Sequence, residues 1–314
     1  MFQKQPIMRR VLYALSPLFL FSIYQYGPRV LLLTAVVFAA GILTEYIIEK
    51  TRNKKVSEAV LVTCGIYVLA LPATVPLWTA VVGIVFAVAI AKGIYGGFGR
   101  NIFNPAIAGR MFIWISFPSI MMTRWAEPGG FGAGMAEAMS ADAVSAATPM
   151  GMLAEGELPA LTDLFLGFHA SSMGEASVLL ILLAGVYLLV TKTANWRLML
   201  STILSAAGFT ALMYYTGITT TLVPQYALMS GSLMYVTVFM VTDPVSAPKN
   251  SNSQFVYGVI IGLVTVLVRT FADFPEGTSF GLLVGNTFAS LLDEIFNGLK
   301  RRAKEKASNA TAQA

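Results

Sequence analysis

The sequence predicts an all-α polytopic membrane protein with about ten transmembrane helices. Three observations predict this class, and the first is composition: 56% of the 314 residues are hydrophobic and only 12% are charged, at a mean hydropathy of +0.70. Soluble domains carry about 25% charged residues. Apolar segments of nearly spanning length recur along the chain, and basic residues gather on alternate connections between them. The chain is therefore expected to lie in a lipid bilayer.

Hydropathy delimits the candidate spans, and turn-forming sequences such as YGPR at 26–29 and FPEG at 274–277 separate them. A helix needs about 20 residues to cross a bilayer, so the shorter segments are expected to tilt little or to lie partly inside the bundle. The predicted spans are 11–26, 30–48, 59–72, 77–94, 103–121, 176–191, 198–217, 224–242, 254–271 and 279–298.

The distribution of basic residues predicts that both chain ends are cytoplasmic (N-in/C-in). With the N-terminus inside, 17 of the 21 Lys and Arg residues fall on inside segments, whereas Arg29 and Arg124 lie outside and Arg110 and Arg269 lie within spans. The first span, with its basic flank, is expected to stay uncleaved. The net charge of +5 then reflects topology, and no nucleic-acid partner is expected.

Spans and charges together divide the chain into five parts. Asn104-Pro105 is expected to be a helix cap with proline in the first turn, and Asp243-Pro244 repeats this device. The two are expected at equivalent inside junctions and favour two inverted five-helix halves. The glycines before Asn104 permit a tight structural turn, or they allow the start of the following helix to receive an anion or the edge of a flavin. The parts are a cytoplasmic N-terminus at 1–10, a first half at 11–121, an extracytoplasmic loop at 122–175, a second half at 176–299 and a basic, disordered cytoplasmic tail at 300–314.

Few residues can bind metals. The single cysteine, Cys64, excludes a disulfide framework and a thiolate cluster within the chain, and the single histidine, His169, excludes a multi-histidine centre. His169 is expected to be a solvated residue of the outer loop. No metal site is predicted.

The outer loop contains the small, polar stretch DAVSAATP at 142–149. A threonine hydroxyl is a weak nucleophile without a neighbouring base, so this stretch alone is typical of an ordinary turn that ends at Pro149. Longer motifs elsewhere change that interpretation. They are LPATVPLWTAVVGIVFAVAIAKGIYGGFGRNIFNPAIAGRMFIWISFP at 71–118, VFMVTDPVSAPKN at 238–250, GILTEYIIEK at 41–50, MGEASVLLILLAG at 173–185 and GNTFASLLDEIF at 285–296.

These motifs, in this order, resemble the membrane flavoprotein family of the Rnf complex D subunit and the Na⁺-translocating NADH:quinone reductase B subunit. In that family FMN is joined through its phosphate to a threonine in the pattern Asp-x-x-Ser/Thr-Gly/Ala-Ala-Thr. Asp142, Ser145, Ala147 and Thr148 stand at the matching positions. The resemblance therefore implies a covalent phosphoester of FMN on Thr148. It also allows a second, non-covalent flavin (riboflavin) near the cytoplasmic side.

The short region before the first span favours the Rnf branch over the quinone-reductase branch. The resemblance then implies one subunit of a six-subunit ferredoxin:NAD⁺ oxidoreductase in the cytoplasmic membrane of a prokaryote, which couples electron transfer to Na⁺ or H⁺ movement. The implied partners are a flavin-bearing extracytoplasmic subunit, subunits with Fe–S and NAD sites, and a flavin transferase for maturation. A passive channel or solute facilitator, and a scaffold that only docks redox partners, are the alternatives from other classes.

Four charged residues within spans are candidates for a function, because a charge there is a functional hypothesis by default. Lys92, near the inner end of the span at 77–94, is counted with the basic residues of the inside segments. Arg269 is placed to meet the flavin phosphate or to snorkel to the outer surface. Arg110 could bind a flavin or pack near Asn104 on the inner half. Glu45 and Asp293 are candidates for an ion pathway, although Glu45 could simply approach the inner surface and Asp293 could pair with Lys300.

Overall fold

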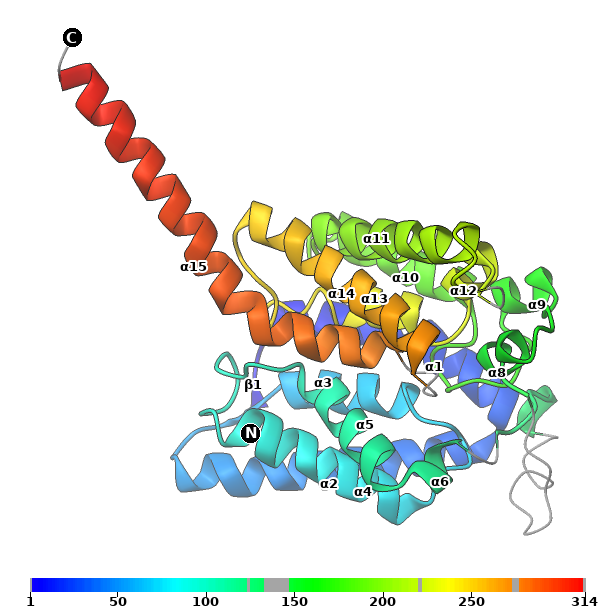
Figure 1. The fold of residues 1–314 in the computed structure, drawn as a ribbon. Helices are drawn as coiled ribbons and strands as arrows, with labels where there is room; N and C mark the ends of the chain where they lie inside the picture. The colour runs from blue at the N-terminus through cyan, green and yellow to red at the C-terminus, as the bar shows by residue number, and fades with distance from the viewer. Residues whose placement is uncertain (1, 123–124, 133–146, 220–221, 273–276, 313–314) are drawn as a thin grey trace.

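The protein forms a bundle of helices in the computed structural model, which describes residues 2–122, 125–132, 147–219, 222–272 and 277–312. The long helices run side by side, as Figure 1 shows. The N-terminal strand β1 (Phe2–Gln3) and the free end of the last helix, α15 (Gly277–Ala312), lie towards one end of the bundle, and α8 (Pro149–Ala154) and α9 (Leu161–Leu166) lie at the other. The two ends of the chain therefore leave the bundle on the same side.

The first half contains five helical segments. They are α1 (Pro6–Tyr26), α2 (Pro28–Thr51), α3 (Ala59–Leu69), α4 (Leu77–Phe86) continued by the π-helical turn η1 (Ala87–Gly93), and α5 (Pro105–Ser116) followed by α6 (Pro118–Met122). Strand β2 (Val56–Ser57) pairs in parallel with β1 just before α3. Nearly every residue of α3 is buried, because neighbouring helices surround this short helix on all sides.

The second half is built in a similar way. It contains α10 (Val178–Val190), α11 (Trp196–Tyr215), α12 (Pro224–Met229), α13 (Leu233–Phe239), α14 (Ser251–Phe271) and α15. The first part of α15 packs along α14 and also reaches α5 and α13, so it joins the two halves (Figure 1). In the connection between the halves, the short 3₁₀ turn η2 (Gly130–Gly132) packs on α1 ahead of α8 and α9.

Each of the ten predicted spans coincides with one helix or with two consecutive helices. By length and hydropathy, α1, α2, α11 and α14 are long enough to cross a membrane, and α3, α4 with η1, and α10 are shorter apolar helices. Two predictions of continuous spans were wrong. The span at 103–121 breaks at Phe117, which precedes a proline and leaves the helical conformation, and the span at 224–242 breaks at Gly231, whose φ is +68°.

The basic tail also differs from its prediction. Residues 300–314 were expected to be disordered, but α15 continues as a helix to Ala312. The sequence after Gly298 contains no further glycine or proline, and alanine, lysine, arginine and glutamate, which favour helix, make up most of it. Local helix propensity therefore outweighs the low hydrophobicity on which the prediction of disorder rested.

Candidate functional site

Thr148 lies at the start of α8, on the side of the bundle away from β1. It is the N-cap residue of that helix: its Oγ1 accepts a hydrogen bond of 3.2 Å from the backbone N–H of Gly151, and Pro149 takes the first helical position. The side chain is half-buried and Ala147 before it is exposed. Among the described residues, the start of α8 therefore lies at the surface of the bundle. Asp142 and Ser145 lie outside the described residues.

Helix α8 is anchored by its apolar side chains rather than by the long helices. Met150 and Leu153 are buried in a small cluster with Leu222 and Ala227, which is separate from the main core. Ala227 belongs to α12, so the residues after Thr148 are held against the broken helix of the second half.

Arg269 is also brought to this region. Its guanidinium donates to the carbonyl oxygens of Ala227 (2.7 Å) and Ser230 (3.1 Å) at the end of α12. A Cβ on Gly231 would lie 3.2 Å from both Arg269 Nη2 and Met150 Cγ. The guanidinium and the second residue after Thr148 thus lie next to the same glycine. The guanidinium is turned onto backbone carbonyl groups of the bundle, and both the phosphate contact and snorkelling stay predictions.

Arg110 binds a carboxylate, and not the region around Asn104 that was one of its two expected partners. It is fully buried in α5 and forms an ion pair of 2.5 Å with Glu175, with Ser172 Oγ 3.3 Å from its second nitrogen. Glu175 is only 4% exposed, although its position between predicted spans assigned it to the outer loop. The packing of Arg110 against the Asn104 region was therefore a wrong expectation, because the arginine side chain reaches the segment that precedes α10.

That segment, residues 167–177, is irregular backbone and is mostly buried in the bundle, although the Phe168 side chain is exposed. Side chains of α1 satisfy its carbonyl groups: Gln25 donates to Gly167, Tyr26 to Ser171 and Ser22 to Met173. Its N–H groups at 173 and 174 donate to carbonyl groups at the end of α3. Irregular backbone within a membrane protein is tolerated only where such partners exist.

His169 belongs to this segment and is not the solvated residue that was expected. Its ring nitrogens lie 3.3 Å from the carbonyl oxygen of Ala170 and 3.1 Å from that of Ala176, so the ring spans the base of the buried turn. Burial lowers the pKa of His169, whereas the two carbonyl groups and the carboxylate of Asp163 oppose that shift.

A second buried ion pair lies towards the opposite end of the bundle. Glu45 in α2 accepts hydrogen bonds from Lys92 Nζ (2.7 Å) and from Ser57 Oγ (2.6 Å) and backbone N (3.0 Å). Lys92 also donates to Ser57 Oγ (2.9 Å), and Glu45 and Lys92 are each 2% exposed. Glu45 therefore does not approach the surface. It is held inside the bundle by a lysine that was expected to flank a span on the cytoplasmic side.

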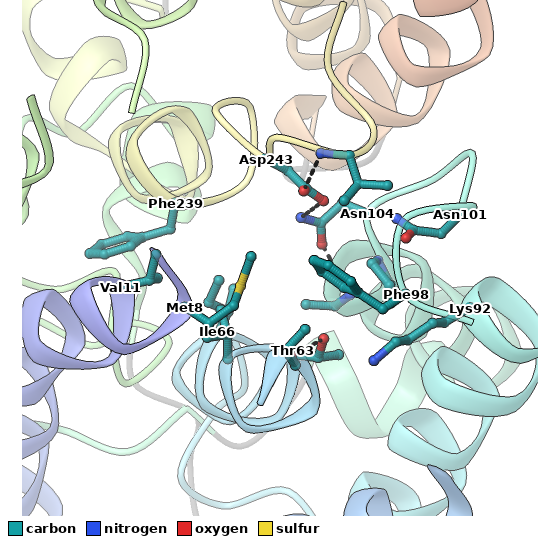
Figure 2. Close-up of a pocket in the computed structure, with 15 residues that line it drawn as sticks. Met8, Val11, Thr63, Ile66, Lys92, Phe98, Asn101, Asn104, Phe239 and Asp243 are labelled. Carbon is teal, nitrogen blue, oxygen red and sulfur yellow. Dashed lines mark hydrogen bonds between the residues drawn. The ribbon is translucent and has the colours of Figure 1, made fainter. Parts of the chain in front are cut away.

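A cavity of about 60 Å³ lies beside this pair. Lys92, Phe98 and Asn101 line one side, and Figure 2 shows Met8, Val11 and Phe239 on the other. Asn104 and Asp243 close one end of the cavity and are joined by a hydrogen bond of 3.2 Å between their side chains.

The two predicted junction devices thus meet in space. Asn104 is the N-cap of α5, as predicted, and accepts from the backbone N–H groups of Ala106 and Ile107. Asp243 instead stabilises a turn after α13, accepting from Val245 N (2.9 Å) and Ser246 Oγ (3.1 Å). Helix α14 takes Asn250 as its N-cap, so the Asp-Pro device follows the end of α13 without starting a helix.

The network around Asn104 continues into the last helices. The Asn286 side-chain oxygen accepts from Asn104 N (2.9 Å), and its amide donates to Tyr257 Oη (2.6 Å). Asn286 carries no charge and lies in an apolar helix, so hydropathy gave it no weight. An uncharged amide inside a predicted span was the signal that could have found it.

Asp293 lies on α15 at the rim of this region. Its carboxylate accepts from the backbone N–H groups of Lys249 (2.7 Å) and Asn250 (2.9 Å), and so holds the segment before α14. The expected alternative partner, Lys300, instead donates to Asn250 Oδ1 at 3.2 Å.

Known proteins resemble this chain along most of its length. The sequence model of the NQR2, RnfD, RnfE family matches residues 2–300. The B subunit of the Na(+)-translocating NADH-quinone reductase of Chromohalobacter salexigens is 37% identical over 288 residues, which are 88% of this chain and 68% of the relative. The D subunit of the Na(+)-translocating ferredoxin:NAD(+) oxidoreductase complex of Acetobacterium woodii is 32% identical over 297 residues, which are 92% of this chain and 88% of the relative.

Proposed function

Because the chain belongs to the NQR2, RnfD, RnfE family, we propose that it is a membrane subunit of an ion-translocating electron-transport complex of the Rnf type. The subunit would carry electrons through FMN on Thr148 and would not be catalytic alone. The match over most of both chains to the D subunit of a ferredoxin:NAD(+) oxidoreductase supports the Rnf assignment. The higher identity to the B subunit of a quinone reductase keeps that complex as the second candidate. A purified complex that reduces NAD⁺ with reduced ferredoxin, and does not reduce quinone with NADH, would support the first.

The single observation that carries the flavin proposal is the position of Thr148. The hydroxyl lies at the half-buried start of a helix, and the Arg269 guanidinium lies beside the second residue of that helix. A phosphate ester on Oγ1 would find the N–H of Gly151, which already donates to this oxygen, and a cation nearby. The residues that are described therefore fit the group. Bound FMN would supply one- and two-electron chemistry, and the chain would hold the phosphate and keep the flavin at the outer end of the bundle.

The test is covalent flavin on the full chain produced with its flavin transferase. Thr148→Ala is expected to abolish in-gel flavin fluorescence and the corresponding mass increase, and Thr162→Ala, an exposed threonine of the same connection, is the matched control. Arg269→Met is expected to lower the fraction of chains that carry flavin. Unmodified Thr148 in protein from native membranes would exclude the electron carrier and favour the facilitator or the scaffold.

Ion translocation is proposed to use Glu45, because it is a buried carboxylate whose lysine partner lines the inner cavity. Asp293 remains a candidate, although its carboxylate already binds two backbone N–H groups. Glu45→Gln is expected to abolish Na⁺- or H⁺-coupled transport while Thr148 keeps its FMN. Normal coupling in this variant would exclude Glu45 from the pathway.

A second, non-covalent flavin is proposed near the cytoplasmic side. The enclosed part of the inner cavity measures about 60 Å³, which is room for a few water molecules, so a flavin there would require the helices around Lys92 and Asn104 to separate.

The proposed setting is the cytoplasmic membrane of a prokaryote, with ten spans and both termini inside. The remaining subunits of a six-subunit complex would supply the Fe–S and NAD sites and an extracytoplasmic flavin. Cysteine labelling at 54 and 155, on opposite ends of the bundle, tests the orientation: only position 54 should be protected from an impermeant reagent in intact cells.

A further inference from the structure

The cation of the Glu45–Lys92 pair lines the cavity beside Asn104, whereas Arg110 of the other buried pair is not among the residues that line this cavity. The ammonium is held by Glu45 Oε2 and Ser57 Oγ, and Ser57 also donates to Glu45 Oε1, so the three side chains form a closed, neutral cluster. Figure 2 shows the Lys92 side chain at the cavity wall, below the Phe98 ring, whose centroid lies 6.0 Å from Nζ. The Lys92 side chain thus lies between the cavity and the carboxylate of Glu45.

Stability alone does not account for this cluster. Burying two ions is costly, and apolar residues of similar volume are often as stabilising or more so. If Lys92 moved away, three oxygen atoms would remain: both carboxylate oxygens of Glu45 and the hydroxyl of Ser57. Hard cations prefer oxygen ligands of this kind. Lys92 therefore occupies the position in which a metal cation would bind.

The backbone around Lys92 offers a way to move it. Lys92 lies in the π-helical turn η1, which has one residue more per hydrogen-bonded turn than an α-helix, and such turns recur at functional sites. Conversion to α-helix would rotate Lys92 about 100° around the helix axis. The chain that follows can absorb this one-residue shift, because Gly96, Gly97 and Gly99 all have positive φ between 87° and 109°.

We propose that Lys92 is the resident counter-ion of Glu45 and that η1 is the element that withdraws it, so that a monovalent metal cation from the cavity can bind Glu45 and Ser57 in its place. The inference rests on the proposed role in ion translocation and adds a positioning residue to it. Only one cation can neutralise Glu45 at a time. The site is consequently closed to leakage whenever Lys92 occupies it.

The test compares Lys92→Met, Lys92→Arg and the double variant Glu45→Gln/Lys92→Met in the full chain with its partner subunits. Thermal unfolding is followed in NaCl and in choline chloride at equal ionic strength, so that general screening is the same. Lys92→Met is expected to be stabilised specifically by Na⁺, with a half-saturating concentration about tenfold or more below that of the wild type. Lys92→Arg should behave as the wild type, and the double variant should show no Na⁺-specific stabilisation.

Equal Na⁺ responses in Lys92→Met and the double variant would overturn the proposal, and so would the absence of any response in Lys92→Met. The double variant leaves no unpaired charge and serves as the folding control. If Lys92→Met cannot be recovered even in NaCl while the double variant folds, the proposal also fails, since Na⁺ should have replaced the missing charge. The readout does not involve electron transfer, so it is independent of whether Thr148 carries FMN.

Discussion

Replacing Glu175 by glutamine would leave the Arg110 guanidinium buried without its counter-ion. The arginine side chain is fully buried and its ion-pair distance to Glu175 is 2.5 Å. Two charges with centres about 4 Å apart attract each other by about 4 kcal/mol at an effective dielectric constant of 20. Measured losses on removal of one partner of a buried pair are about 3–5 kcal/mol. We therefore expect Glu175→Gln to lower Tm by roughly 10 °C.

The assay is thermal unfolding of the purified chain in detergent, with Glu157→Gln, an exposed glutamate of the same outer connection, as the control. Arg110→Met should be similarly destabilised, because it leaves the carboxylate unpaired. The double variant Arg110→Met/Glu175→Leu removes both charges and should recover most of the loss. A double variant as unstable as the sum of the single variants, or Glu175→Gln as stable as the control, would refute the reasoning.

Three further perturbations test other parts of the structure. Gly231→Ala places a Cβ at φ +68° against the Arg269 guanidinium, which should cost about 1–2 kcal/mol and reduce the fraction of flavin-bearing chains in the in-gel fluorescence assay. Asn104→Ala removes the α5 cap and should lower the free energy of unfolding by about 1 kcal/mol or more, as measured in a thermal melt. Asn104→Asp keeps the cap but places a second carboxylate beside Asp243. An Asn104→Asp variant more stable than the wild type would contradict the hydrogen bond between these two side chains. Burial lowers the pKa of His169 in the folded chain, so as pH falls the unfolded chain takes up this proton first. The stability should therefore be full above the usual histidine pKa of about 6.5 and decline below it. In Tm measurements from pH 7.5 to 5, His169→Phe should not show that decline.

The helix positions were predictable from the sequence because burial in lipid leaves long apolar runs. The breaks within the helices were less visible, since a hydropathy window averages over Phe117 and Gly231 without registering a change of backbone conformation. The N-cap at Asn104 was predictable because its signal, Asn-Pro before an apolar run, is local.

Contacts between distant segments left no trace in the sequence. Glu175 was assigned to the outer loop by its position between spans, and nothing near it indicates a partner 65 positions earlier in Arg110. Lys92 was counted as a flank residue for the same reason, because charge counting assumes that a basic residue near a helix end reaches water. The attachment candidate Thr148 depended on resemblance, and its structural surroundings, including Arg269, came only from the fold.

The two buried ion pairs are chemically alike, but we expect different effects of Na⁺ on the stability of variants that lack one charge of each pair. Arg110 and Glu175 are buried where α5 meets the irregular segment at 167–177, and neither residue lines the cavity beside Asn104. Removing one charge there should only destabilise, whatever salt is present. Lys92 does line that cavity and lies in a turn that can change register. Loss of Lys92 should therefore be compensated by Na⁺, whereas loss of Glu175 or Arg110 should not. Equal salt responses of the two pairs would mean that both are structural, and the inner pair would then have no part in coupling.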